Sequence, residues 1–393
     1  MSLLLKHGTV VGPDALLENH DVRVEGDTIT EIGPHLEPRS GEDVEEARGA
    51  WVVPGLIDIH ADYIEHMAAP RPTAVLDFTL SLREAERELL GHGITTMFHS
   101  LSFYGSTDFG TNPVRSPENS RKLIDLIDRS HDAEHLIRHR FHARFEIDHV
   151  AMVPDLERLI EEGKVHLLSF MDHSPGQGQY RDLELYKLIL KGYRKLGEGE
   201  AEKLITESKD RVKVPFETLK RLADLARSRG LAVASHDDDT IEKLDVVQAL
   251  GSTISEFPIT IEVALEARRR GLATVAGAPN VLLGGSHSGN LCAADAIVAG
   301  AVDVLCSDYY PASLLHAVFQ LHRERALPLA EAFRLVTLNP AQAVGLGERF
   351  GSIEKGKAGD LLVVRTLDDG FPYVSRAIVA GHLLGSWDYR RHA

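Results

Sequence analysis

The sequence predicts an α/β protein: a (β/α)8 TIM barrel with a small β-sandwich domain formed by both termini. Two observations predict the barrel. Eight short apolar runs recur after residue 54, and segments with helical periodicity lie between them, as in parallel βαβ units. Eight such units in about 300 residues match a closed barrel with insertions. The third observation is that both ends of the chain carry strand patterns without any helix.

The β-sandwich domain is expected from the strand patterns at the two termini. The first group ends before Pro54-Gly55, and Gly26-Asp27 marks a hairpin within it. Strand patterns return after Gly351, at residues 360–364, 373–379 and 382–387. We therefore expect residues 1–53 and 352–393 to form the β-sandwich domain, and residues 54–351 to form the barrel domain.

The barrel strands are expected at eight apolar runs. These are residues 56–59, 95–98, 141–147, 165–171, 231–235, 253–257, 274–278 and 302–307. Helices are expected between them, notably at residues 82–92, 121–127, 216–230, 261–270 and 293–300, and several of these end in glycine. The longest insertion covers residues 176–214.

Composition and charge exclude several classes of protein. Hydrophobic residues make up 43% and charged residues 26% of the 393 positions, which is typical of a globular protein. The net charge of −16 argues against nucleic-acid and membrane partners, which require an excess of cations. Two cysteines, no leader-like segment and no long apolar run favour the cytoplasm. The sequence is compatible with a homo-oligomer.

Imidazoles and carboxylates follow five of the eight predicted strands. Taken singly, each is more often a hydrogen-bonded loop residue or a helix cap than a ligand. Their coincidence in one barrel reverses that preference, because the C-terminal strand ends meet at one mouth. Mixed nitrogen and oxygen ligands suit zinc, manganese, iron or cobalt. The strand-end residues are His60, Asp62, Glu146, Asp172, His173, His236, Asp237, Asp238, Asp239 and Asp308.

Two loops are candidates for binding an anion. Residues 284–290 follow the seventh strand, and their glycines, hydroxyls and backbone N–H groups could cradle a phosphate. Arg71 lies between two prolines after the first strand. The alternative for both segments is an ordinary turn.

The strand-end motifs resemble those of the amidohydrolase superfamily. The resemblance rests on VPGLIDIH at residues 53–60, LNPAQA at 338–343 and GSIEKGKAGDL at 351–361. Longer motifs closely resemble the triphosphate diphosphatases of the carbon–phosphorus lyase pathway of phosphonate catabolism. These are SFMDHSPGQ at 169–177, ASHDD at 234–238, GAPN at 277–280, GSHSGN at 285–290 and SDYYPASLL at 307–315.

This resemblance implies an activity and a site. The implied reaction is hydrolysis of α-D-ribose 1-methylphosphonate 5-triphosphate to the 5-phosphate and pyrophosphate, with two divalent ions as cofactors, zinc first and manganese or iron as alternatives. Asp308 is expected to accept the proton of the attacking water. The implied metal ligands are His60, Asp62, Glu146 as the bridge, His173, His236 and Asp308. The expected substrate-binding residues are Arg71, Gln177, His287 and Ser288, with Arg181, Lys187 and Lys191 as further cationic candidates.

One departure from the family pattern bears on the substrate. The superfamily usually has His-x-His on the first strand, whereas this chain has His-x-Asp, as the diphosphatases do. Glu65 and His66 then add a carboxylate and an imidazole that the diphosphatase pattern does not explain. The alternative function is therefore an amidohydrolase of another specificity, a cyclic amidase, N-acyl deacetylase or deaminase. A non-catalytic binding protein is disfavoured, because all six ligands are present.

Overall fold

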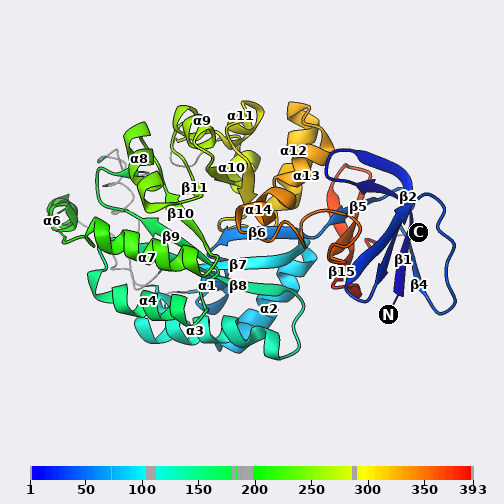
Figure 1. The fold of residues 1–393 in the computed structure, drawn as a ribbon, viewed down its shortest axis with the longest axis horizontal. Coiled ribbons are helices and arrows are strands. Elements are labelled where there is room, and N and C mark those ends of the chain that lie inside the picture. The colour runs from blue at the N-terminus through cyan, green and yellow to red at the C-terminus, as the bar shows by residue number, and fades with distance from the viewer. Residues whose placement is uncertain are drawn as a thin grey trace.

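The structure is a computed structural model, and it has two parts, a barrel and a smaller β module that carries both termini (Figure 1). It describes residues 2–71, 73–102, 112–178, 198–209, 211–285 and 290–390, together with Leu183 and Lys187. The predicted fold class, a TIM-like barrel with a β domain built from both ends of the chain, is confirmed.

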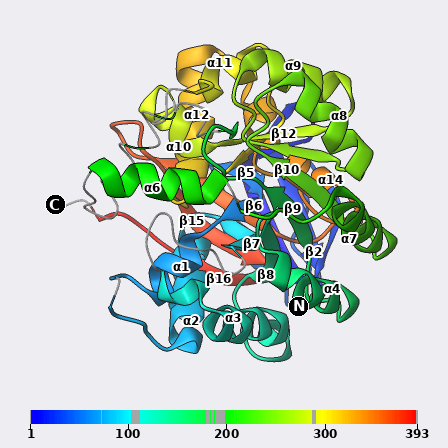
Figure 2. The same cartoon turned by 90° about the vertical axis from the view of Figure 1, so that its left-hand side faces the viewer.

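The barrel consists of eight parallel strands in sequential order. They are β6 (Leu56–Ala61), β7 (Ile94–Ser102), β8 (Arg138–Glu146), β9 (Leu167–Met171), β10 (Ala232–His236), β11 (Ile254–Glu256), β12 (Ala273–Gly277) and β13 (Val304–Cys306). The first and last strands meet at one bridge, between Ala61 and Asp308, so the barrel is nearly closed. The C-terminal ends of the strands form the barrel mouth, on the side away from the β module. This side faces the viewer in Figure 2.

Helices surround the strands (Figure 2). Four of them begin where the sequence offers a cap: the side chains of Asp77, Ser116, Thr240 and Thr260 accept hydrogen bonds from backbone N–H groups in the first turn. The helices are α1 (Tyr63–Ala68), α2 (Phe78–Gly91), α3 (Pro117–Arg129), α4 (Val153–Glu161), α6 (Glu198–Lys209), α7 (Phe216–Ser228), α8 (Ile241–Leu250), α9 (Ile261–Arg269), α10 (Ala278–Leu283), α11 (Ala293–Val298), α12 (Ser313–Arg325), α13 (Leu329–Arg334) and α14 (Leu338–Ala343). None of these described helices is long and apolar enough to cross a membrane.

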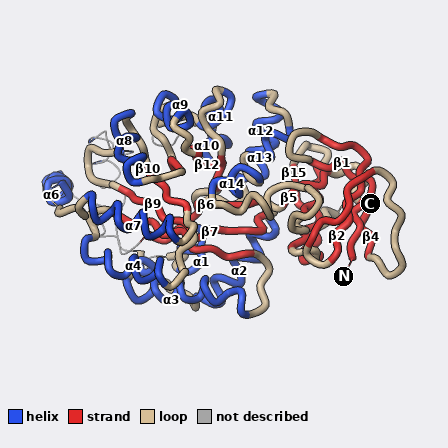
Figure 3. The backbone as a smooth tube through the Cα atoms, in the orientation of Figure 1, coloured by secondary structure: helices blue, strands red, loops and turns tan. Residues whose placement is uncertain are grey.

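The β module is one mixed sheet built from both ends of the chain (Figure 3). Its strands are β1 (Ser2–Val11), β2 (Leu16–Glu25), β3 (Thr28–Gly33), β4 (Asp43–Glu46), β5 (Trp51–Pro54), β14 (Leu361–Thr366), β15 (Pro372–Val379) and β16 (His382–Ser386). Antiparallel pairing of β5 with β14 joins the two ends. Val22 and Ile378 come from opposite halves of the sheet and belong to one buried cluster, so the sheet curls around its own core.

Several short elements were not predicted from the sequence. These are the strand β4 and the six-residue helices α1, α10, α13 and α14. A helix of six residues spans less than two turns, so its apolar period cannot be recognised. The helices α1, α10 and α13 pack on the barrel, where Ile64, Val281 and Phe333 are buried in the main core, and β4 pairs with β1 in the β module.

A buried ion pair stabilises the β module. The Glu42 side chain is 1% exposed, and its Oε1 accepts hydrogen bonds from Arg23 Nε at 2.8 Å and from Ser2 Oγ at 2.6 Å. Burial alone would raise the pKa of Glu42, but these hydrogen bonds outweigh it and lower the pKa to about 2. The folded state therefore holds this carboxylate in its charged form more strongly than the unfolded chain does.

This linkage gives a pH-dependent prediction. Glu42→Gln should lower the free energy of unfolding by about 1.5–3 kcal/mol at neutral pH, because a charged hydrogen-bond acceptor is lost. The deficit should be full above about pH 4.5 and should shrink as the pH falls towards about 2, because the parent carboxylate then becomes protonated. Urea denaturation across this range measures it. Glu84→Gln, at an exposed pair with Arg87, is the control, and equal stability of Glu42→Gln and parent at neutral pH would contradict the prediction.

Candidate active site

The candidate site lies at the C-terminal mouth of the barrel. His60 is the penultimate residue of β6, Glu146 ends β8, His236 ends β10 and Glu256 ends β11. Because all these strands are parallel, their C-terminal ends gather at the same edge of the barrel. The polar strand ends that are distant in the sequence are therefore neighbours in space.

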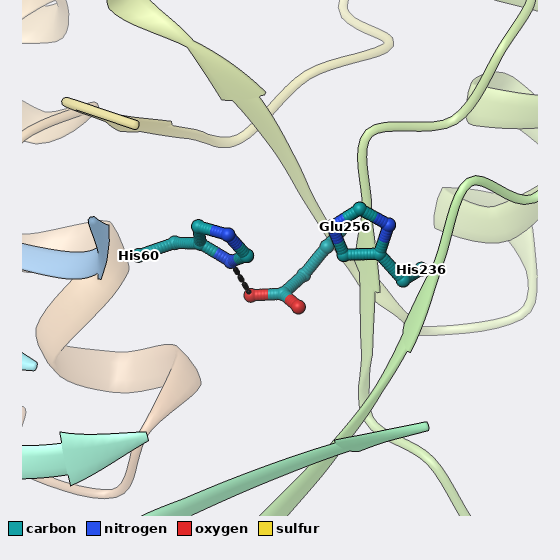
Figure 4. Close-up of side chains that lie close together, drawn as sticks. All are labelled: His60, His236 and Glu256. Atoms are coloured by element: carbon teal, nitrogen blue, oxygen red, sulfur yellow. Dashed lines mark hydrogen bonds and ion pairs between the residues drawn. The ribbon is translucent and has the colours of Figure 1, made fainter. Parts of the chain in front are cut away.

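One group of side chains converges on His60 (Figure 4). His60 is 1% exposed, and its Nδ1 lies 2.8 Å from Oε1 of the fully buried Glu256. The rings of His60 and His236 have centroids 5.5 Å apart. Burial lowers the pKa of His60 well below its ordinary value, and the positive charge of Arg144 lowers it further. The imidazole is thus held neutral, which is the form that coordinates a metal ion.

A second group shares His236 with the first. His173 Nδ1 lies 2.6 Å from Glu146 Oε1, and His236 Nδ1 lies 3.1 Å from Asp237 Oδ2. The ligand atoms of His173, His236 and Asp237 all lie within 4.8 Å of one another, as do those of His60, His236 and Glu256. The two groups therefore form one continuous cluster of imidazoles and carboxylates.

The cluster contains buried polar atoms that suit a metal ion. Among the described residues, neither His236 Nε2 nor Glu256 Oε2 has a hydrogen-bond partner. Buried polar atoms of this kind are rare, because each costs free energy when left unsatisfied. Imidazole nitrogens and carboxylate oxygens are ligands for zinc, manganese and iron. The residues present therefore fit a divalent metal ion.

Asp308 and Asp62 lie beside this cluster at the seam of the barrel. Asp308 N donates to His60 O at 3.0 Å, and Asp62 N donates to Asp308 O at 3.0 Å. Asp308 has a positive φ of 58°, which turns the chain sharply at the end of β13. Burial raises the pKa of Asp308 to about 7, and the negative charge of Asp62 adds to the rise. A carboxyl group with such a pKa can accept a proton near neutral pH.

Further hydrogen bonds hold the loops that carry these side chains. Lys243 Nζ donates to the carbonyl oxygens of His236 at 2.8 Å and Asp237 at 2.9 Å. Asp238 Oδ2 accepts from Ser235 Oγ at 2.6 Å and from Ser255 Oγ at 2.5 Å. The loop after β10 is therefore fixed to both its own strand and the next one.

The structure brings most of the predicted ligands together. His60, His173, His236 and Glu146 lie in the cluster, and Asp62 and Asp308 adjoin it through the backbone of the seam. Of the expected substrate-binding residues, Arg71 and Gln177 have exposed side chains. His287 and Ser288 lie outside the described residues, as do Arg181 and Lys191, while Lys187 pairs with Glu202 at 2.7 Å.

Glu65 and His66, which the diphosphatase pattern does not explain, both lie in α1, and Glu65 has a structural role there. Glu65 is 3% exposed, and its Oε2 accepts hydrogen bonds from Arg115 Nε and Asn112 Nδ2, each at 2.8 Å. His66 is exposed on the same helix. Glu65 is thus occupied by an ion pair at the edge of the mouth, with Asp62 lying 4.0 Å from Arg115 Nη2.

Two residues of the cluster were not among the six ligands expected from the sequence. Glu256 was hidden within an apolar run, although its place at the C-terminal end of that run matched the rule applied to the other strands. Asp237 was present in the acidic run after β10, but nothing in the sequence distinguishes it from Asp238 and Asp239. Asp237 has a positive φ of 53° and its Oδ2 lies 3.1 Å from His236 Nδ1, and neither feature is visible in the sequence.

Comparison with known proteins defines the class. The sequence matches the amidohydrolase family over residues 51–384, so the chain belongs to the amidohydrolase family. It is 36% identical over 330 residues to the α-D-ribose 1-methylphosphonate 5-triphosphate diphosphatase of Escherichia coli strain K12, covering 82% of this chain and 85% of that enzyme. A shorter similarity, 46% over 65 residues, relates 16% of the chain to 15% of a dihydroorotase of Bacillus licheniformis.

Solved structures share the fold at low sequence identity. Molinate hydrolase has a TM-score of 0.67 at 16% identity, with 100% of this chain and 98% of that chain covered. A Xaa-Pro dipeptidase with bound methionine has a TM-score of 0.65 at 14% identity, with 98% and 99% covered. These similarities support the architecture described above.

The shared position of His236 gives a prediction about metal content. The purified protein should hold about one to two divalent ions per chain, and a chelator should abolish turnover. His236→Asn should lose at least about one ion, because His236 belongs to both ligand groups. Elemental analysis measures this, with exposed His66→Asn as the control. Full metal retention by His236→Asn would contradict the assignment.

Proposed function

We propose that this protein hydrolyses α-D-ribose 1-methylphosphonate 5-triphosphate to the 5-phosphate and pyrophosphate. The observation that carries the proposal is the 36% identity to the Escherichia coli diphosphatase, which extends over 82% of this chain and 85% of that enzyme. The cluster of His60, His236 and Glu256 at the barrel mouth supplies the ligand chemistry that a metal-dependent hydrolase needs. We place the enzyme in the cytoplasm, without nucleic-acid or membrane partners. Both a monomer and a homo-oligomer are compatible with the proposal.

The proposed cofactors are two divalent ions, with zinc first and manganese or iron as alternatives. Bound there, such ions lower the pKa of water and offset negative charge on phosphate oxygens. The first ligand group is His60, His236 and Glu256, and the second is His173, His236 and Asp237. The sequence-based ligands Asp62, Glu146 and Asp308 are proposed to complete the two coordination shells.

The reaction adds water across the inner phosphoanhydride. The water oxygen bonds to phosphorus, the bond from that phosphorus to the bridging oxygen breaks, and both outer phosphoryl groups leave together as pyrophosphate. Asp308 is proposed to accept the proton of the water, because it lies at the barrel seam beside the ligand cluster. The backbone hydrogen bond to His60 O and the turn at its positive φ fix its position.

The alternative is an amidohydrolase acting on carbon. The segment similar to dihydroorotase favours it, but that segment covers only 16% of the chain. Fold and metal ligands alone do not separate the two chemistries, because they are shared within large superfamilies. The pairing of Glu65 with Arg115 removes one reason for preferring the alternative, since this carboxylate is already occupied.

The products of the reaction test the proposal directly. A ribose 5-triphosphate should release pyrophosphate and no orthophosphate in the first turnover, because a single cleavage frees both outer phosphoryl groups as a unit. Phosphorus NMR of the metal-loaded protein distinguishes the two products. Dihydroorotate and N-acyl substrates serve as the comparison on the same preparation. Turnover of an amide without pyrophosphate release would reject the proposal in favour of the alternative.

Removal of the proposed proton acceptor should lower kcat. Asp308→Asn should decrease kcat at least about 100-fold, because general-base catalysis typically contributes that much, while KM changes little. Asp303→Asn is the control. Asp303 lies directly before β13 and pairs with Arg268, so this variant should retain parental kcat. Steady-state pyrophosphate assays measure both variants. A kcat of Asp308→Asn within about tenfold of the parent would remove Asp308 from this role.

A further inference from the structure

Arg144 places a positive charge on the inner wall of the barrel mouth. It lies in β8 between His142 and Glu146, and residues two apart in a strand point to the same face. His142 faces the barrel interior, where its ring lies 5.0 Å from that of His60. Glu146 faces the mouth, where it contacts His173. Arg144 therefore lies on the face that lines the candidate site, one step below its rim.

The guanidinium of Arg144 has no carboxylate partner among the described residues. Its Nε donates to Met171 Sδ at 3.2 Å, and a thioether sulfur is a weak acceptor without charge. Arg115, a second described arginine near the mouth, is instead held by Glu65 at 2.8 Å. Among the described residues, the terminal nitrogens of Arg144 have no hydrogen-bond partner, so these nitrogens can donate to an anion.

The charge of Arg144 reaches the groups around the site. Burial raises the pKa of Asp308 and that of Glu65, and the positive charge of Arg144 opposes the rise in both. It also favours the charged form of Glu146. Its charge therefore acts on three carboxyl groups of the mouth, whereas Arg71 is exposed.

The substrate class needs such a residue. A triphosphate carries several negative charges, and the protein has a net charge of −16, so cations must be supplied locally. The planar guanidinium matches phosphate oxygens with two parallel N–H donors, which a lysine cannot reproduce. A neutral cyclic amide carries no negative charge for this guanidinium to bind.

We infer that Arg144 binds the triphosphate of the substrate and selects it over uncharged substrates of the same fold. This inference rests on the proposed function. The terminal N–H groups of Arg144 donate to phosphate oxygens, while the hydrogen bond from Nε to Met171 fixes the plane of the guanidinium. Arg115 is a positioning residue for Glu65 and Asp62 at the rim.

Binding of a nonhydrolysable probe tests the inference. An α,β-methylene nucleoside triphosphate is titrated calorimetrically into the metal-loaded parent, Arg144→Met, Arg144→Lys and Arg140→Met. Arg144→Met should weaken binding at least about 30-fold, as for the loss of a buried charge partner. Arg144→Lys should recover only part of the loss, because the paired donors are missing. Arg140→Met removes the same charge from the same strand and should bind within about threefold of the parent.

Two further measurements separate this role from a structural one. Metal content and the unfolding midpoint of Arg144→Met should match those of the parent. If Arg144 only balanced the charge of Glu146 and Asp308, its replacement would alter metal content or the pH profile of activity. Probe affinity would then stay unchanged. If Arg144→Met does not fold, Arg144→Lys decides the case through its affinity. Parental probe affinity in a folded Arg144 variant overturns the inference.

The test also distinguishes failure of the inference from failure of the proposed function. If the parent binds the probe, loses binding in Arg144→Met and yet releases no pyrophosphate, the anion site stands and the proposed reaction fails. If the parent releases pyrophosphate and Arg144→Met retains parental KM, the reaction stands and the role of Arg144 is overturned.

Discussion

The arrangement of the site depends on the hydrogen bonds that join the first and last barrel strands. Asp308 N donates to His60 O, and Asp62 N donates to Asp308 O, each at 3.0 Å. These contacts connect residues that are almost 250 positions apart in the sequence and bring both ends of the barrel to one mouth. Beneath them, Asp58 Oδ1 accepts from Ser307 N at 3.1 Å and strengthens the same seam. Without this closure, His60 and Asp308 could not belong to one site.

Closure of the barrel also buries polar side chains at the mouth, which costs free energy. Burying imidazoles and carboxylates away from water is unfavourable unless each polar atom finds a partner. Several do so within the protein: Lys243 and two serines satisfy the loop after β10. Others, such as Glu256 Oε2 and His236 Nε2, have no hydrogen-bond partner among the described residues, and a divalent cation would satisfy them. Arg144 adds a positive charge on the strand that also carries Glu146.

The sequence predicted the architecture well because strand and helix alternation is a local pattern. Its strand-end rule also located His60, His173 and His236, since polar residues after apolar runs are visible without a structure. It could not find Arg144, because an arginine inside a strand reads as a surface residue until the inner face of β8 is known. Glu256 was missed for a related reason, as it lies within an apolar run. The conformation of Asp237 and the pairing of Glu65 with Arg115 depend on contacts between distant segments.

The most direct test of the account is the position of bound metal in a crystal of the metal-loaded protein, located by anomalous scattering. The account predicts scattering peaks at the barrel mouth, one coordinated by His60, His236 and Glu256 and one by His173, with Asp308 adjoining them. Coordination that joins residues of β6 and of β10 or β11 would establish that barrel closure assembles the centre. Peaks outside the mouth, or an ion held without any residue of β6, would contradict the account.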